Sequence, residues 1–192
     1  MSGGLYYLVS SLPYLRFGEP APLDSGLFFN MCRGFVSDSQ LDRLQTLTLE
    51  PQEPPCCDAA SAWNQFETDL RNWTVRLRGQ ALRVDAERFL RPEGDLSAAM
   101  ELQVTEALDQ RTPVETEKRL DEMRWQTLEN LRVGHDYDFE GLVVYRLKLA
   151  ILEKWADHDR PAGRDRLMNA VDTLQEHSAP DGDDGSGPEN DI

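Results

Sequence analysis

The chain has 192 residues, of which 40% are hydrophobic and 29% charged, and acidic side chains outnumber basic ones 35 to 20, for a net charge of −15. This excess of acids argues against binding to nucleic acid or to an anionic membrane surface, because both depend on clustered Lys and Arg. No apolar stretch approaches the roughly 20 residues of a membrane-spanning helix, and the first residues lack the charged start of a signal peptide. We therefore expect a cytoplasmic protein.

The first third of the chain predicts short helices followed by a proline-rich break. Residues 1–49 are interpreted as an N-terminal helical segment, in which residues 6–9 fit either a short strand or the start of a helix. Ser37 lies three residues before Gln40, which is the spacing of a capping box at a helix start. Pro51, Pro54 and Pro55 then interrupt the pattern, and we interpret residues 50–60 as a linker.

Residues 61–84 carry the most regular helical pattern. Apolar side chains recur at steps of three and four residues, which places them on one helix face: Trp63, Phe66, Leu70, Trp73 and Leu77. Gly79 lies within this pattern and lowers helix stability by about 1 kcal/mol relative to Ala, so it could interrupt the helix.

The second half predicts further helices. Apolar residues between 96 and 107 indicate one helix, and the pair Thr112-Pro113 is a favourable start for the next, which Gly134 is placed to end. Residues 139–156 are apolar almost all round, which is typical of a central buried helix. An amphipathic helix at residues 167–174 closes the main helical domain, residues 61–177, and the Gly-, Pro- and Asp-rich residues 178–192 are expected to form a disordered acidic tail. The fold class is all-α, a compact multi-helix bundle.

Motifs for catalysis or cofactor binding are missing from the sequence. It contains neither a phosphate-binding glycine loop nor a nucleophile elbow. His135 precedes Asp136 and Asp138, an arrangement that a hydrolase would gather in a cleft, but an aspartate before a helix is better explained as its cap. No second His or Cys stands at metal-ligand spacing. We predict no enzyme activity, no cofactor and no metal, and we expect the three cysteines, an odd count, to be free thiols.

A cluster of arginines stands out against the acidic background. Residues 61–91 hold six basic and four acidic side chains, so this segment alone is positive, and all six basic residues are arginines between positions 71 and 91. One interpretation is a basic face that docks an acidic partner through bidentate guanidinium–carboxylate contacts. The other is pairing within the chain, for example between Glu67 and Arg71, which are four residues apart.

Three stretches together resemble a known family. They are Tyr-Tyr-Leu-Val-Ser-Ser-Leu-Pro at residues 6–13, the segment from Phe66 to Arg78, and the apolar segment from Leu142 to Trp155. Their combination and order are similar to a bacterial family of unassigned function that is encoded with V/A-type ATP synthases. That family in turn looks like a shortened form of the C-type cap subunit of the V-type ATPase, which is named d in eukaryotes. The chain is about half as long as that subunit, so its bundle would correspond to part of the subunit's fold.

The resemblance implies a role in holding proteins together. The cap subunit is all-helical, sits on the membrane rotor ring, receives the central stalk and performs no chemistry. We therefore expect a non-enzymatic subunit or an accessory or assembly factor, peripheral to the inner membrane through ATPase subunits of the stalk or rotor ring. We expect partner contacts from Arg71, Asn72, Arg76 and Arg78, and a frame that contains Trp63, Trp73, Tyr145 and Trp155. The alternative is a free-standing regulatory adapter without any ATPase contact, which could use the acidic tail as its interaction element.

Overall fold

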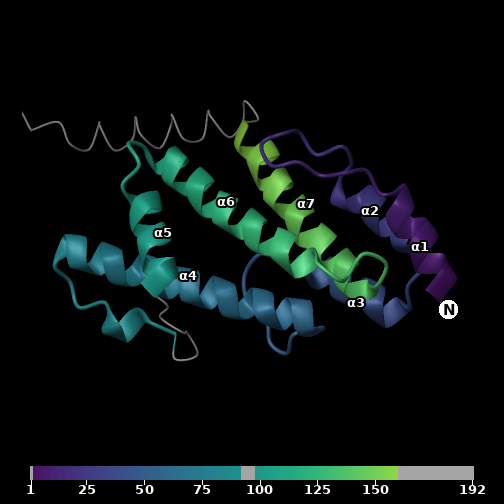
Figure 1. Ribbon diagram of the computed structural model, residues 1–192, viewed down its shortest axis with the longest axis horizontal. Helices are drawn as coiled ribbons and strands as arrows, with labels where there is room; N and C mark the ends of the chain where they lie inside the picture. The colour runs from purple at the N-terminus through teal and green to yellow at the C-terminus, as the bar shows by residue number, and fades with distance from the viewer. Residues whose placement is uncertain (1, 92–97, 160–192) are drawn as a thin grey trace, which may run out of the picture. The chain divides into compact units, whose positions relative to one another are not determined.

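The computed structural model describes residues 2–91 and 98–159, and in that part of the chain the elements of regular structure are all helices, with no strand. The elements are α1 (Ser2–Ser11), α2 (Ser25–Cys32), α3 (Asp38–Thr46), α4 (Asp58–Leu82), the short 3₁₀ helix η1 (Glu87–Phe89), α5 (Ala98–Leu108), α6 (Pro113–Arg132) and α7 (Phe139–Asp159) (Figure 1). This confirms the all-α class. The predicted helix at 167–174 and the predicted tail lie outside the described residues, as do residues 92–97.

Two compact units divide the chain after Lys154. Nearly all of the described chain lies in the first unit, and residues 155–159, the last turns of α7, are the described part of the second. Within the second unit the rings of Trp155 and His158 meet edge to face, with centroids 5.6 Å apart. None of the helices in residues 2–91 and 98–159 has both the length and the apolar character needed to cross a bilayer.

The helix starts follow from local side-chain chemistry. The Ser37 hydroxyl accepts a hydrogen bond from the backbone N–H of Gln40, and the Gln40 side chain accepts one from the Ser37 N–H. Thr112 and Glu115 form the same capping box at the start of α6. Both boxes satisfy backbone N–H groups that a helix start leaves unpaired. The α6 helix ends before Gly134, whose φ of 89° lies in the left-handed region that favours glycine. These predicted boundaries are confirmed. The ambiguous residues 6–9 lie within helix α1 and bury Leu8.

Helix α4 differs from its prediction at both ends. It begins at Asp58, inside the segment interpreted as a linker, and continues without a break through Gly79 to Leu82, so the expected interruption at Gly79 is wrong. Gly79 is buried because the chain returns against it: a Cβ built there would lie 2.5 Å from the Cβ of Ala86. The glycine therefore permits close packing of residues 84–86 rather than ending the helix.

The irregular residues before α4 pack onto that helix. The indole nitrogen of Trp63 donates to the carbonyl of Leu49 at 3.1 Å. The Asn64 amide donates to the carbonyl of Gln52 at 2.7 Å and accepts from its N–H at 3.3 Å. Residues 49–52 are thereby fixed against the first turns of α4.

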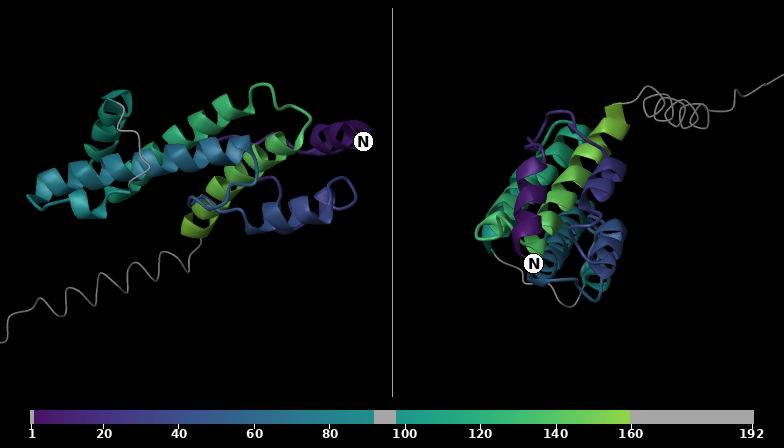
Figure 2. Two further views of the ribbon diagram at one scale, coloured as in Figure 1. Left: turned by 90° about the horizontal axis from the view of Figure 1, so that it is seen from below. Right: turned by 90° about the vertical axis from the view of Figure 1, so that its right-hand side faces the viewer.

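The core has two parts, joined through α6 and α7. Helix α7 is buried on nearly all sides between Leu142 and Leu152, as its composition predicts, and α6 lies on one side of it with α1 and α2 on another (Figures 1 and 2). The Tyr145 hydroxyl donates to the carbonyl of Pro13 at 3.0 Å, and the Phe28 ring stacks on the Tyr145 ring. The second part, between α4, α5 and α6, is centred on Leu70, Trp73, Val104, Ala107 and Leu120. The predicted frame residues Trp63, Trp73 and Tyr145 are buried, and Trp155 is half-buried.

Candidate functional site

Asn72 lies on α4 and is used within the chain. Its side chain is only 2% exposed, its amide NH₂ donates to the carbonyl of Arg91 at 2.8 Å, and its carbonyl accepts from the Arg91 N–H at 2.8 Å. This two-point contact fixes the end of residues 83–91 to α4. The Asn72 amide is therefore occupied by the backbone and does not face solvent.

Arg76 is also held by its own chain. Its Nη2 lies 3.1 Å from Glu87 Oε1, and its guanidinium stands over the ring of Trp73 at 5.7 Å from the centroid. Both contacts restrain the guanidinium on the surface of the α4 helix.

Arg71 and Arg78 are different, because both are exposed and neither forms a hydrogen bond or ion pair with another described residue. The predicted pair between Glu67 and Arg71 does not form. The Glu67 carboxylate instead accepts from Arg124 of α6, at 2.6 Å from Nε and 3.2 Å from Nη2. The guanidinium of Arg71 is thus left to solvent.

A depression of about 400 Å³ collects these free arginines. Arg71 and Arg78 line it together with Arg91, which the sequence analysis did not single out as a contact residue. Leu49, Leu70 and Leu120 line it as well. Five further charged residues complete the charged lining: Glu50, Glu67, Glu117, Arg124 and Lys154. Because Arg78 stands two helix turns beyond Arg71, both point to the same face of α4.

A cluster of paired charges that joins α4, α6 and α7 lines part of the same depression. Asp121, which is 0% exposed, accepts from Arg124 Nη1 at 2.8 Å and from Lys154 Nζ at 2.9 Å. Lys154 also donates to Glu117. Burial raises the pKa of Glu67 despite the opposing charge of Arg124, whereas the partial burial of Glu117 is outweighed by Lys154, which lowers its pKa. Because Arg124 and Lys154 each pair with carboxylates of other helices or turns, the cluster is a cross-link between three helices.

The His135 group forms a helix cap at the surface. His135 Nδ1 lies 2.8 Å from Asp138 Oδ2, and the other oxygen of Asp138 accepts from the Gly141 N–H at 2.9 Å, which confirms the predicted cap of α7. The hydrogen bond to Asp138 raises the pKa of His135. Asp136 is not part of this group and lies 4.0 Å from Arg132 Nε instead. Among the described residues, no set of three or more His, Cys, Asp or Glu side chains has the arrangement of a metal site.

The cysteines are free thiols in different surroundings. Cys32 is buried, and burial raises its pKa to about 11. Cys56 and Cys57 have sulfur atoms 4.0 Å apart just before α4, and burial raises the pKa of Cys57 to about 11 as well. A thiol with a raised pKa is mostly protonated at neutral pH and hence a poor nucleophile.

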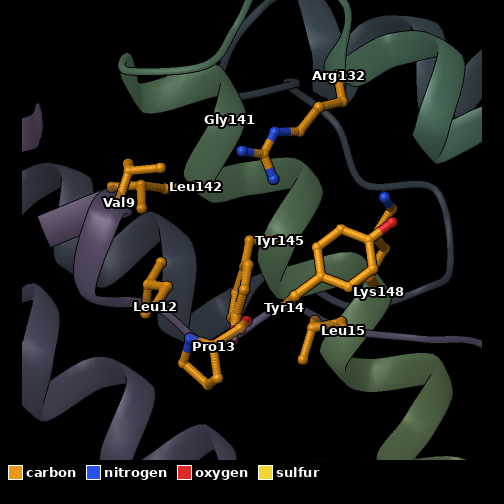
Figure 3. Close-up of a pocket in the computed structure, with 10 residues that line it drawn as sticks. All are labelled: Val9, Leu12, Pro13, Tyr14, Leu15, Arg132, Gly141, Leu142, Tyr145 and Lys148. Atoms are coloured by element: carbon orange, nitrogen blue, oxygen red, sulfur yellow. Dashed lines mark hydrogen bonds between the residues drawn. The ribbon is translucent and has the colours of Figure 1, made fainter. Parts of the chain in front are cut away.

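A smaller pocket, of about 100 Å³, lies between residues 9–15, the end of α6 and the first turns of α7 (Figure 3). Two cationic side chains line it, Arg132 and Lys148, among the rings of Tyr14 and Tyr145 and several aliphatic residues. The sequence analysis missed this pair. The two cations belong to different helices and are 16 positions apart, so no spacing pattern connects them.

These features describe an all-helical protein with a well-packed frame, a set of free surface arginines and a small cationic pocket. Residues 92–178 match the family model described as "Protein of unknown function (DUF2764)", so this part of the chain is similar to that family. The match spans α5, α6 and α7, and it leaves the arginines at positions 71–91 outside. Neither the curated proteins nor the solved structures gave a match.

Proposed function

We propose that the chain is a non-enzymatic helical subunit, or an accessory or assembly factor, of a bacterial V/A-type ATPase. It acts as a protein scaffold between the central stalk and the membrane rotor, in the cytoplasm and peripheral to the inner membrane. The observation that carries the proposal is the depression lined by Arg71, Arg78 and Arg91, because none of these three guanidinium groups has an ion-pair partner among residues 2–91 and 98–159. The resemblance of residues 6–13, 66–78 and 142–155 supplies the identity of the partner.

The charge of the chain explains how such a surface would select its partner. A protein of net charge −15 repels acidic proteins in general, so a local group of arginines offers an acidic segment one favourable place to dock. Guanidinium groups match carboxylates in a bidentate geometry, and such contacts contribute more to partner choice and to the rate of encounter than to affinity.

The structure narrows the residues that can make these contacts. We propose Arg71 and Arg78 as partner contacts, as the sequence suggested, and add Arg91 because it lines the same depression. Arg76 and Asn72 are held by Glu87, Trp73 and the Arg91 backbone, so we assign them to positioning this surface.

The experiment compares two double variants with the same change in charge. We expect R71E/R78E to lose co-purification of stalk or rotor subunits from detergent-solubilised membranes, by about tenfold or more. The control R16E/R119E replaces two exposed arginines that lie outside the depression and form local ion pairs with Glu19 and Glu122. It should retain the wild-type yield, and circular dichroism should be the same for all three proteins.

Two results would count against the proposal. Failure of the wild-type chain to co-purify any ATPase subunit would remove the assigned partner, and equal retention by R71E/R78E would remove the docking surface. The alternative, a free-standing regulatory adapter, rests on residues 178–192, which hold five acidic and no basic side chains. Loss of all partners on deletion of these residues would favour the adapter.

A further inference from the structure

The small pocket in Figure 3 contains an arginine that forms no hydrogen bond with the other described residues. Arg132 is the last residue of α6, and its guanidinium points from the helix end toward Tyr145 (Figure 3). Its Nε is buried and has no hydrogen-bond partner. The nearest carboxylate to this nitrogen, Asp136, is 4.0 Å away and 67% exposed, so it lies beyond hydrogen-bond distance and mostly in water.

A second cation closes the pocket from α7. The side chain of Lys148 is only 7% exposed, and its ammonium donates to Glu129 at 2.8 Å and lies 5.1 Å from the centroid of Trp125. An ammonium has three N–H groups, so the carboxylate and the ring leave one of them for another acceptor. Burial holds the pKa of Lys148 below its usual value, and the charge of Arg132 lowers it further while Glu129 opposes the change.

Glu129 neutralises Lys148, but among the described residues no carboxylate lies within hydrogen-bond distance of Arg132. Glu129 is bonded to Lys148, and the hydroxyl of Tyr145 is engaged with the carbonyl of Pro13. The remaining lining is Val9, Leu12, Leu15 and Leu142, with the exposed ring of Tyr14 at the edge. Aliphatic walls lower the local dielectric, which strengthens the attraction of a guanidinium for an anion.

We propose that this pocket binds a small phosphate-type oxyanion between the Arg132 guanidinium and the Lys148 ammonium. Such an ion accepts several hydrogen bonds at once, and Arg132 offers five N–H groups in a planar fork that fits two oxygens of one anion. The volume of about 100 Å³ is several times the roughly 10–15 Å³ that a single water needs, so a small tetrahedral anion has room there. The site is independent of the docking arginines and of the ATPase assignment.

Calorimetric titration of the full chain with inorganic phosphate at constant ionic strength tests the site. Sodium acetate and sodium chloride serve as the comparison anions, and O-phosphoserine tests a phosphoryl group carried by a larger molecule. The variants are R132Q and K148M, with R119Q as the matched control. Arg119 lies on the same helix, 13 residues or about 20 Å from Arg132, and is exposed with a single pair to Glu122.

We expect wild-type protein and R119Q to bind phosphate alike and in preference to acetate and chloride. R132Q should weaken binding by about tenfold or more, because it removes charged hydrogen bonds, and K148M should weaken it as well. R132Q is the decisive variant, since the one ion pair of Arg132 among the described residues is the 4.0 Å contact with the exposed Asp136. Circular dichroism checks the helicity of the variant. Tighter binding of O-phosphoserine supports the same site with a ligand presented by a larger molecule. Absence of phosphate binding, equal response to all three anions, or equal affinity of R132Q and wild type would overturn the proposal.

Discussion

Replacement of Gly79 by alanine should destabilise the protein, against the usual effect of that change in a helix. Alanine in a helix interior is normally more stable than glycine by roughly 0.5–1 kcal/mol, because glycine loses more backbone freedom on folding. At position 79 the new Cβ would lie 2.5 Å from the Ala86 Cβ and 3.2 Å from the carbonyl oxygen of Val84. Two methyl carbons normally meet at about 3.5–4.0 Å, so residues 84–86 must shift.

The size of the effect follows from these two opposing contributions. Overpacking by one methyl group costs about 1–3 kcal/mol, and an approach as short as 2.5 Å belongs at the upper end of that range. After subtraction of the gain in helix propensity, we expect the free energy of unfolding of G79A to fall by about 2 kcal/mol.

Urea denaturation followed by circular dichroism measures this change, with two further variants to assign its cause. In G4A the new Cβ meets the Phe35 ring at 3.5 Å, which is ordinary contact, so the same substitution should be neutral or stabilising there. The double variant G79A/A86G removes the closest atom and should recover part of the loss, with a coupling energy of about 1 kcal/mol. A G79A protein as stable as wild type, or no coupling with A86G, would refute the argument for close packing.

Three other predictions concern the charges and caps. Asp121→Asn should lower the free energy of unfolding by about 2–3 kcal/mol, because it weakens the charged hydrogen bonds that Arg124 and Lys154 donate to the buried carboxylate. Glu122→Gln at the surface should change it by less than about 1 kcal/mol, and urea denaturation compares the two. Asp138→Asn should lower the pKa of His135 in an NMR titration while the asparagine still caps α7. Since the folded-state pKa of His135 is raised, protonated His135 stabilises the folded protein below pH 6.5, and this stabilisation is lost as the pH rises through the folded-state pKa. In the Asp138→Asn variant the free energy of unfolding should therefore fall less over that pH range. Thr112→Ala should lower the free energy of unfolding by about 1 kcal/mol, measured by thermal unfolding, because the capping box is lost. For each of these three substitutions, a result equal to wild type would contradict the role given to that residue.

Features of the fold that depend on near neighbours were predicted from the sequence. The caps at Ser37, Thr112 and Asp138 each involve residues three positions apart, so the pattern alone defines them. The buried faces of α4 and α7 follow from the spacing of apolar residues in the same way. Residues 6–9 were ambiguous because four residues are too few to separate a period of two from one of 3.6.

Features that depend on distant contacts were not predicted. Glu67 has Arg71 at the favourable spacing of four, yet it bonds to Arg124, which is 57 residues away. Asn72 is a polar residue of the type found at protein surfaces, but its side chain binds the backbone of Arg91, 19 residues further along the chain. Arg132 and Lys148 face one pocket only because α6 and α7 lie side by side. Neither helix sequence carries information about the other, so propensity and periodicity cannot identify such pairs.

The central position of α7 has a consequence for synthesis of the chain on the ribosome. Ser25, at the start of α2, bonds to Glu153, which is synthesised 128 residues later. At 5–20 residues per second, this delay is roughly 6–26 s. During that interval Phe28 and its neighbours have no α7 to cover them, so the N-terminal helices remain open to chaperones and proteases. Only after residues 142–152 leave the exit tunnel can this half of the molecule close, and the yield of intact protein depends on how well the nascent chain is protected until then.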